Sequence, residues 1–354
     1  MSIPTEPIGS IPRPPELIAG IGANAAGTLP AGELAVLFDS ALRDTVQRLE
    51  ATGSPVISDG EQTKPSFATY PLDGSDIYAS DGAVIPFADG HTRQLPRLVG
   101  GPFRYGTYAE GYLRAAKKLT DLPVKQAVIA PSALSLLYPA DGVSGYSREE
   151  FIADLLNEAE ADVRRALEAG AHVVQLDFTE GRLALKLDPS AGVLGSFVEL
   201  NNQLLDRFTE AERAKIGLHT CPGGDGDSTH SADIDYALLL PDLFRIKVGN
   251  VYIQLASEAD PRRVLEIAAQ HLRPEQRLFV GVIDPIDPKV ETPEEVRDRI
   301  LLAAEFISPE QLGSTDDCGF SPFADDVSTS RDIAFAKIQA RVQGTALASE
   351  QLGV

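Results

Sequence analysis

The sequence has few cysteines, few basic residues and no long apolar run. Only Cys221 and Cys318 occur among its 354 residues. This excludes a disulfide-stapled secreted domain and favours a reducing cytoplasm. Lysine and arginine number 31 against 52 aspartate and glutamate residues, which leaves a net charge of −21. Such a surface repels phosphate backbones and anionic lipid, so we expect neither nucleic acid nor membrane partners.

Signals for membrane insertion and secretion are also missing. No run of about 18 apolar residues is present, so we expect no transmembrane helix. The first residues, Met1 to Pro7, lack a basic region and an apolar core, so we expect no signal peptide. The chain is 43% hydrophobic, which is enough for a large core. Its length suits a single α/β barrel, and we assign residues 1–354 to one catalytic domain.

Short apolar segments alternate with amphipathic helical segments along the chain. The clearest helix, over 147–169, begins with a capping box of Ser147 and Glu150 and ends at Gly170. Eight strands, most of them followed by a helix, predict an α/β fold of the (β/α)₈ (TIM) barrel type. The predicted strands are 7–14, 55–58, 124–130, 172–176, 216–219, 251–255, 278–283 and 312–315. The predicted helices are 33–52, 108–119, 147–169, 198–208, 230–240, 261–272, one beginning at 292, and 328–347.

An irregular segment, 67–105, interrupts this pattern after the second strand. It is rich in glycine, proline, aspartate and aromatic residues. Residues 83–87 and 94–99 read as hairpin strands around Asp89 and Gly90. A loop of this length in a compact domain is usually a functional element. We therefore predict an insertion that acts as a lid.

Unusual polar residues stand where the predicted strands end. Active sites of such barrels lie at the C-terminal ends of the strands, so this placement marks the candidate site. The residues are Ser10, Asp59, Glu61, Ser132, Asp177, His219, Cys221, Gln254, Asp284 and Cys318.

A histidine and both cysteines belong to this set. His219 and Cys221 are two positions apart, so their side chains point to one side of the fifth strand. Cys318 follows the eighth strand. One imidazole and two thiolates would hold Zn²⁺ and leave a position open, as catalytic zinc sites do. The alternatives are that the cysteines are small buried hydrophobes or form a disulfide.

Five short motifs resemble the catalytic, C-terminal domain of cobalamin-independent methionine synthase. They are Ile8 to Arg13, Asp59 to Glu61, Val174 to Asp177, His219 to Cys221, and Asp316 to Gly319. Their order and spacing extend the similarity over nearly the whole chain, which is most similar to short, single-domain relatives. The resemblance implies zinc held by His219, Cys221 and Cys318. It also implies that Ser10, Glu61 and Asp177 bind the amino-acid end of homocysteine, and Ser132 joins them as a candidate substrate-binding residue.

The chain departs from the family pattern at two strand ends. Where the family has a glutamate as fourth zinc ligand, this chain has Gln254; Gln254 or the nearby Glu258 is the candidate fourth ligand. Where the family has a histidine after the seventh strand, Ile286 stands here and Asp287 follows. The candidate catalytic residues are Asp287 and Asp177, which stands at the end of the fourth predicted strand.

The resemblance implies a zinc-dependent S-methyltransferase of methionine biosynthesis. It would transfer a methyl group from methyltetrahydrofolate or a methylcorrinoid to the zinc-bound thiolate of homocysteine. One alternative is a related alkyltransferase for another thiol, of the epoxide:coenzyme M type, or a C–S lyase. A metal-free decarboxylase on a similar barrel would need clustered arginines, which the strand ends lack. A binding protein with structural zinc would normally supply four protein ligands.

Overall fold

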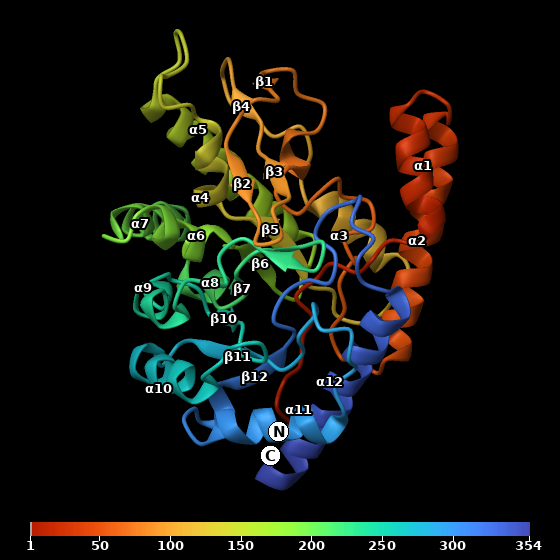
Figure 1. Ribbon diagram of the computed structural model, residues 1–354, viewed down its shortest axis with the longest axis vertical. Coiled ribbons are helices and arrows are strands. Elements are labelled where there is room, and N and C mark those ends of the chain that lie inside the picture. The colour runs from red at the N-terminus through yellow and green to blue at the C-terminus, as the bar shows by residue number, and fades with distance from the viewer. Residues whose placement is uncertain (1) are drawn as a thin grey trace.

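A parallel sheet forms the centre of the computed structural model, which describes residues 2–354. Its six strands follow the order β12-β11-β10-β7-β6-β5, and all neighbouring pairs are parallel. The helices lie around this sheet, and the two chain ends lie close together (Figure 1). The backbone amide of Ile3 donates a hydrogen bond to the Ser349 hydroxyl, so the first residues are tied to the last helix. The predicted α/β class is confirmed.

The element bounds agree with most of the predicted segments. The helices are α1 (Pro15–Ala25), α2 (Ala31–Ala51), α3 (Glu110–Lys117), α4 (Pro131–Leu134), α5 (Arg148–Glu168), α6 (Glu180–Leu187), α7 (Gly192–Leu205), α8 (Glu210–Arg213), α9 (Leu240–Leu243), α10 (Pro261–His271), α11 (Pro293–Ala304) and α12 (Arg331–Leu352). The sheet strands are β5 (Gln126–Ile129), β6 (Val174–Asp177), β7 (Ile216–Thr220), β10 (Asn250–Ile253), β11 (Arg277–Gly281) and β12 (Leu312–Thr315). Short two- or three-residue strands are β1 (Tyr78–Ala79), β2 (Val84–Pro86), β3 (Thr92–Gln94), β4 (Arg97–Leu98), β8 (Gly224–Asp225) and β9 (Ser228–Thr229). Single 3₁₀ turns are η1 (Tyr70–Leu72), η2 (Ser135–Leu137), η3 (Tyr236–Leu238) and η4 (Pro309–Gln311).

The first and second predicted strands are not regular strands. Thr5 makes a single parallel bridge to Ser314, and Ile57 makes one to Val124, so one segment lies at each edge of the sheet. The predicted strand over 7–14 is wrong, because prolines within it have no N–H to donate to a ladder. The amide of Ile11 donates to the Gly60 carbonyl at 3.0 Å, which links the two edge segments to each other.

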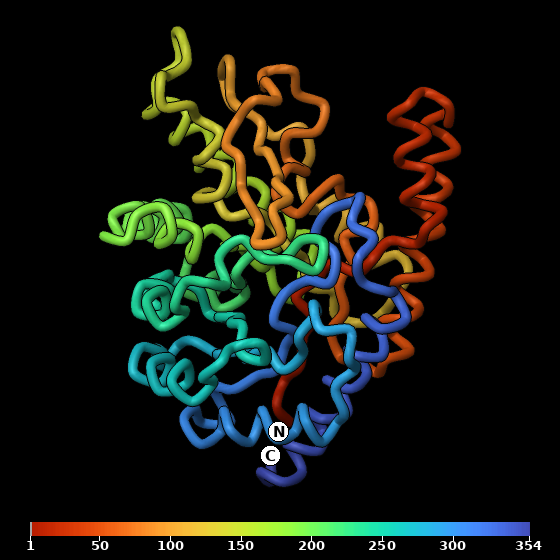
Figure 2. The backbone as a smooth tube through the Cα atoms, in the orientation of Figure 1, coloured from red at the N-terminus to blue at the C-terminus, as the bar shows by residue number. Residues whose placement is uncertain are grey.

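One helix prediction is wrong, and one helix was not predicted. Residues 230–239 form only bend, turn and 3₁₀ structure before α9, rather than one helix. Helix α1, which the sequence reading left unassigned, pairs with α2 to form a hairpin at the side of the molecule (Figure 2). The capping boxes at Ser147 and Thr292 are present as predicted. Among residues 2–354, no helix combines the length and hydrophobicity needed to cross a membrane.

The segment 67–105 forms two small antiparallel pairs. Strand β2 pairs with β3 across the predicted turn, whereas β4 pairs with β1 instead of continuing that hairpin. The tip of β2–β3 reaches β9, where the Ala88 amide donates to the Thr229 carbonyl at 2.9 Å. This contact places the hairpin over the loops that follow β7 (Figure 1).

Candidate metal centre and substrate pocket

The structure brings His219, Cys221 and Cys318 together. His219 lies on β7, Cys221 directly follows that strand, and Cys318 lies three residues beyond the end of β12. The potential ligand atoms of the three side chains all lie within 4.8 Å of one another. The two Sγ atoms are 3.0 Å apart, well beyond a disulfide bond length, and both cysteines are free.

The unsatisfied ring nitrogens of His219 show that this donor set fits a metal ion. The side chain is buried, yet neither Nδ1 nor Nε2 has a hydrogen-bond partner among the described residues. Such a buried polar group normally finds a partner, because leaving it unpaired is costly. The hydrogen bond with Cys221, together with burial, holds the pKa of the Cys318 thiol well above its usual range. A bound cation would satisfy the imidazole and favour both thiolates.

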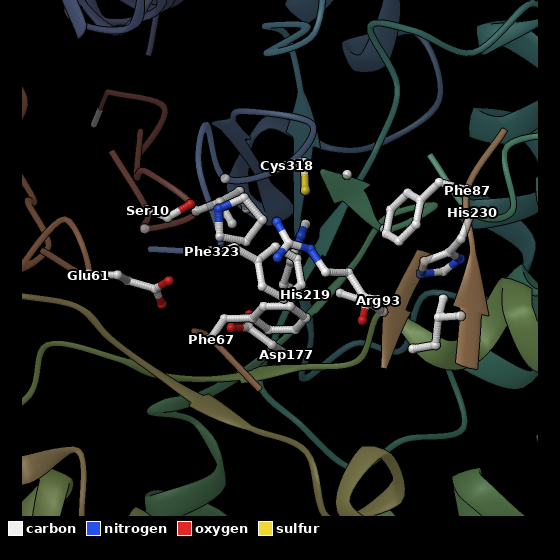
Figure 3. A pocket seen from close by; sticks show the side chains of 18 residues that line it. Ser10, Glu61, Phe67, Phe87, Arg93, Asp177, His219, His230, Cys318 and Phe323 are labelled. Carbon is white, nitrogen blue, oxygen red and sulfur yellow. The ribbon is translucent and has the colours of Figure 1, made fainter. Parts of the chain in front are cut away.

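A pocket opens beside this cluster. Its wall contains His219, Cys318, Glu61 and Asp177; Asp177 lies beside His219 on the neighbouring strand, and Glu61 lies farther away (Figure 3). Much of the remaining wall is apolar: Ile8, Phe67, Ile85, Phe87, Pro322 and Phe323. The pocket therefore presents soft ligands and carboxyl groups to the same enclosed space.

The carboxyl side of the pocket contains a buried ion pair. Lys64 Nζ lies 3.1 Å from Glu61 Oε1 and donates to the Ala127 carbonyl at 2.9 Å. Burial raises the pKa of Glu61 to about 7 even though Lys64 opposes the shift. Burial also raises the pKa of Asp177, whose Oδ1 accepts a 2.7 Å hydrogen bond from Gln175. Lys64 pairs with Glu61, and Asp177 has no ion-pair partner among the described residues, so the site suits a further cationic group.

The backbone around Glu61 is held in an uncommon conformation. Glu61 has φ of 55°, in the left-handed region that side chains other than glycine rarely adopt. Arg13 fixes this turn, since its guanidinium donates to the Glu61 carbonyl at 2.6 Å and to the Lys64 carbonyl at 2.8 Å. The loop thus aims the Glu61 side chain into the pocket (Figure 3).

Ser10 reaches the pocket through a close approach to the loop after β12. Its hydroxyl accepts a hydrogen bond from the Ser321 amide at 3.2 Å. A Cβ atom at Gly319 would lie 2.1 Å from the Ser10 hydroxyl oxygen, so only glycine allows this contact. Ser10 and Gly319 both line the pocket.

Two other predicted site residues, Ser132 and Asp287, do not line the pocket. Ser132 is buried and does not line the pocket; its hydroxyl donates to Glu180 and also bonds Asn201. Asp287 is exposed and accepts from the Lys289 amide, so the structure does not bring this candidate catalytic residue to the pocket. It sits in the loop beyond β11, past the strand end that would aim it inward.

The two candidate fourth ligands, Gln254 and Glu258, bind each other. Gln254 Nε2 donates to Glu258 Oε1 at 2.8 Å, and Arg182 donates to the same oxygen at 2.8 Å. Glu258 is absent from the group of possible metal ligands. The guanidinium of Arg182 therefore engages the carboxylate that the sequence offered as a replacement ligand.

The sequence reading missed Lys64, which pairs with the pocket residue Glu61, and Arg93, which lines the pocket. Lys64 follows the Asp59 to Glu61 motif, but nothing local signals that its ammonium is buried. Arg93 on β3 bonds Asp225 at 2.5 and 3.0 Å and Asp325 at 2.9 Å, which ties the hairpin to two loops at the mouth. These contacts join positions more than 100 residues apart, so no short sequence motif predicts them.

The fold and this site together define a class of α/β enzymes with a strand-end cluster of soft ligands, and solved structures show the same fold. A B12-independent methionine synthase from Shewanella sp. W3-18-1, solved in complex with selenomethionine, aligns with a TM-score of 0.76. That alignment has 20% identity and covers 99% of each chain.

Sequence comparison identifies the family. The family described as the catalytic domain of cobalamin-independent synthase matches residues 3–333. The methionine synthase of Sulfurisphaera tokodaii is 22% identical over 99% of this chain and 94% of its own. That of Saccharolobus solfataricus is 24% identical over 99% and 96%. The chain therefore belongs to the cobalamin-independent methionine synthase family and is a methyltransferase of that family.

Proposed function

We propose that the whole chain is one catalytic domain that methylates a thiol, with homocysteine as acceptor and zinc as the metal. The observation that carries this proposal is a single pocket whose wall contains two kinds of chemical group. His219 and Cys318 offer ligands for a soft cation, and Glu61 and Asp177 offer carboxyl groups for an ammonium. An amino acid with a thiol side chain has both matching ends.

Binding of the amino end would rest on the chain's own carboxyl groups. The ammonium of the acceptor would pair with Asp177 and Glu61, and Ser10 would lie beside its carboxylate. Burial raises the pKa of Glu61, and Lys64 opposes that rise and so favours the ionised form that an ammonium needs. A sulfonate such as that of coenzyme M would meet these carboxyl groups unfavourably, which argues for the amino acid.

Methyl transfer at the thiol end of the acceptor depends on the thiol being ionised. Zinc held by His219, Cys221 and Cys318 would lower the pKa of a coordinated thiol and supply the thiolate nucleophile. The β2–β3 hairpin, tied down by Arg93, would serve as the lid over the reaction and, with the apolar walls, would keep water from the reacting groups. Free cysteines this close together also suit a reducing compartment, and we place the reaction in the cytoplasm.

Elemental analysis of purified variants tests the metal assignment. We expect about one zinc per chain in the wild type and a large loss of zinc in Cys318→Ser and His219→Ala. Glu258→Gln is the matched control, because Glu258 pairs with Arg182 and should leave the zinc content unchanged. Equal zinc in wild type and Cys318→Ser would remove that residue from the site.

A further inference from the structure

A second cavity lies directly beside the reaction pocket. It shares Phe67, Ile85, Thr179 and His230 with the wall of the pocket beside the metal cluster. A group in this cavity would therefore be a neighbour of the acceptor. Most of its other lining residues are apolar, among them Ile129, Leu134, Leu136, Leu137 and Leu183.

One carboxyl group, that of Glu180, interrupts this apolar wall. Glu180 begins α6 and is only 4% exposed. Its Oε1 accepts a hydrogen bond from the Ser132 hydroxyl, whereas its Oε2 has no partner among the described residues. Burial raises the pKa of Glu180 to about 8, outweighing the bonds from Ser132 and the backbone at the start of α6. A buried carboxyl with a free oxygen and no cation is a costly arrangement that a ligand can relieve.

Neither cavity offers a free positive charge to an anionic ligand. Arg93 is the only lysine or arginine among the described residues that line them, and Asp225 and Asp325 both engage it. Burial lowers the pKa of His230 on the shared wall to about 4, so this imidazole is neutral near pH 7. An anionic tail held in these cavities would find no counter-ion.

We propose that the second cavity is the subsite for the methyl donor and that it takes a methylated onium ion, a sulfonium or a quaternary ammonium. The inference rests on the proposed function, because it assigns the donor for the acceptor in the neighbouring pocket. A protonated amine would need up to three hydrogen-bond acceptors, and the cavity offers few. An onium ion has no N–H to satisfy; it needs apolar contact, one carboxylate and an aromatic face such as that of Phe67.

The transfer then balances without another reactant. The bond between the methyl carbon and the donor sulfur or nitrogen breaks, and both electrons stay on the donor atom, which becomes neutral. The acceptor thiolate supplies the electron pair of the new S–C bond and loses its negative charge. Glu180 has then lost its cationic partner and takes up a proton from water as the neutral leaving group departs.

Calorimetric titration with two small onium probes tests the ligand class without metal or thiol. Trimethylsulfonium and tetramethylammonium represent the two sources of the charge, and dimethyl sulfide is the uncharged comparator. We expect at least one onium ion to bind the wild type roughly tenfold or more tightly than dimethyl sulfide. Glu180→Gln should weaken onium binding about tenfold to a hundredfold, the usual effect of losing a hydrogen bond or contact with a charged partner.

The matched control is Glu266→Gln. Glu266 is an exposed residue of α10, so this variant makes the same change in net charge away from both cavities. It should bind the probes like the wild type. Equal loss in both variants, or undiminished binding in Glu180→Gln, would overturn the proposal. If Glu180→Gln does not fold, the wild-type comparison decides alone: dimethyl sulfide binding as tightly as both onium ions refutes the charge requirement.

Turnover with homocysteine separates this inference from the proposed function. Methyl transfer from an onium donor, sensitive to Glu180→Gln, supports both. Turnover with methyltetrahydrofolate or methylcobalamin but not with any onium donor overturns the donor assignment and leaves the function standing. Glu180-dependent onium binding with no methylation of any thiol would contradict the function while the ligand class stands.

Discussion

Removal of the Lys64 ammonium should destabilise the protein far more than loss of a surface charge. The Lys64–Glu61 pair is 3.1 Å apart, and its side chains are 1% and 3% exposed. At an effective dielectric constant of about 20, two charges at that distance attract by about 5 kcal/mol. Breaking a buried pair from one side typically costs about 3–5 kcal/mol, because the other charge is left buried. We expect Lys64→Met to lose about that much free energy of unfolding.

A double-mutant cycle isolates the pair. Lys64→Met, Glu61→Gln and the double variant are unfolded in urea and followed by far-ultraviolet circular dichroism at pH 7.5. We expect the double variant to cost at least about 2 kcal/mol less than the sum of the single variants, because it leaves no unpaired charge.

The exposed pair of Arg97 and Asp81 provides the matched control cycle. Its side chains are 34% and 65% exposed, so water and salt screen most of the attraction between the two charges. The coupling between Arg97→Met and Asp81→Asn should be correspondingly small. If the destabilisation by Lys64→Met and by Glu61→Gln is additive, so that their coupling is as small as in the surface cycle, the reasoning that this ion pair balances the acidic pocket is refuted.

Three further predictions concern ligand binding and the hairpin. Asp177→Asn should weaken homocysteine binding about tenfold to a hundredfold by calorimetry, and an unchanged dissociation constant would remove Asp177 from the site. Binding of norleucine, which has the amino-acid end without the thiol, should tighten as pH rises from 6 to 8. The reason is that Glu61, with a pKa of about 7, must lose its proton to pair with the ammonium; a profile unaltered in Glu61→Gln would contradict this. Arg93→Ala removes the bonds to Asp225 and Asp325, so amides of β3 should exchange hydrogen faster, and equal protection would show that these bonds do not hold the hairpin.

Local patterns predicted much of the scaffold. Six of the eight predicted strands coincide with sheet strands, because buried apolar runs between helices leave few other choices. The boxes at Ser147 and Thr292 marked helix starts through contacts only three residues long. The metal cluster was also predictable, since His219 and Cys221 share a strand end and Cys318 was the only other cysteine.

Features that depend on contacts between distant positions of the chain could not be predicted from the sequence. Arg182 and Glu258 pair across 76 positions, so their chemical type could not show that Glu258 has a partner. Glu180 was unremarkable in the sequence and became informative only when the structure placed it in the wall of an apolar cavity with one carboxyl oxygen unpaired. Helix α1 follows a proline-rich segment, which obscured its start at Pro15.

The most direct test of the central claim is the number of sulfur neighbours around the bound metal, measured by zinc X-ray absorption with and without homocysteine. The account predicts one zinc per chain with sulfur from Cys221 and Cys318, and one additional sulfur when homocysteine is added. A sulfur count that homocysteine leaves unchanged, in protein that binds this amino acid, would contradict the claim that the cluster and the acidic pair bind one acceptor.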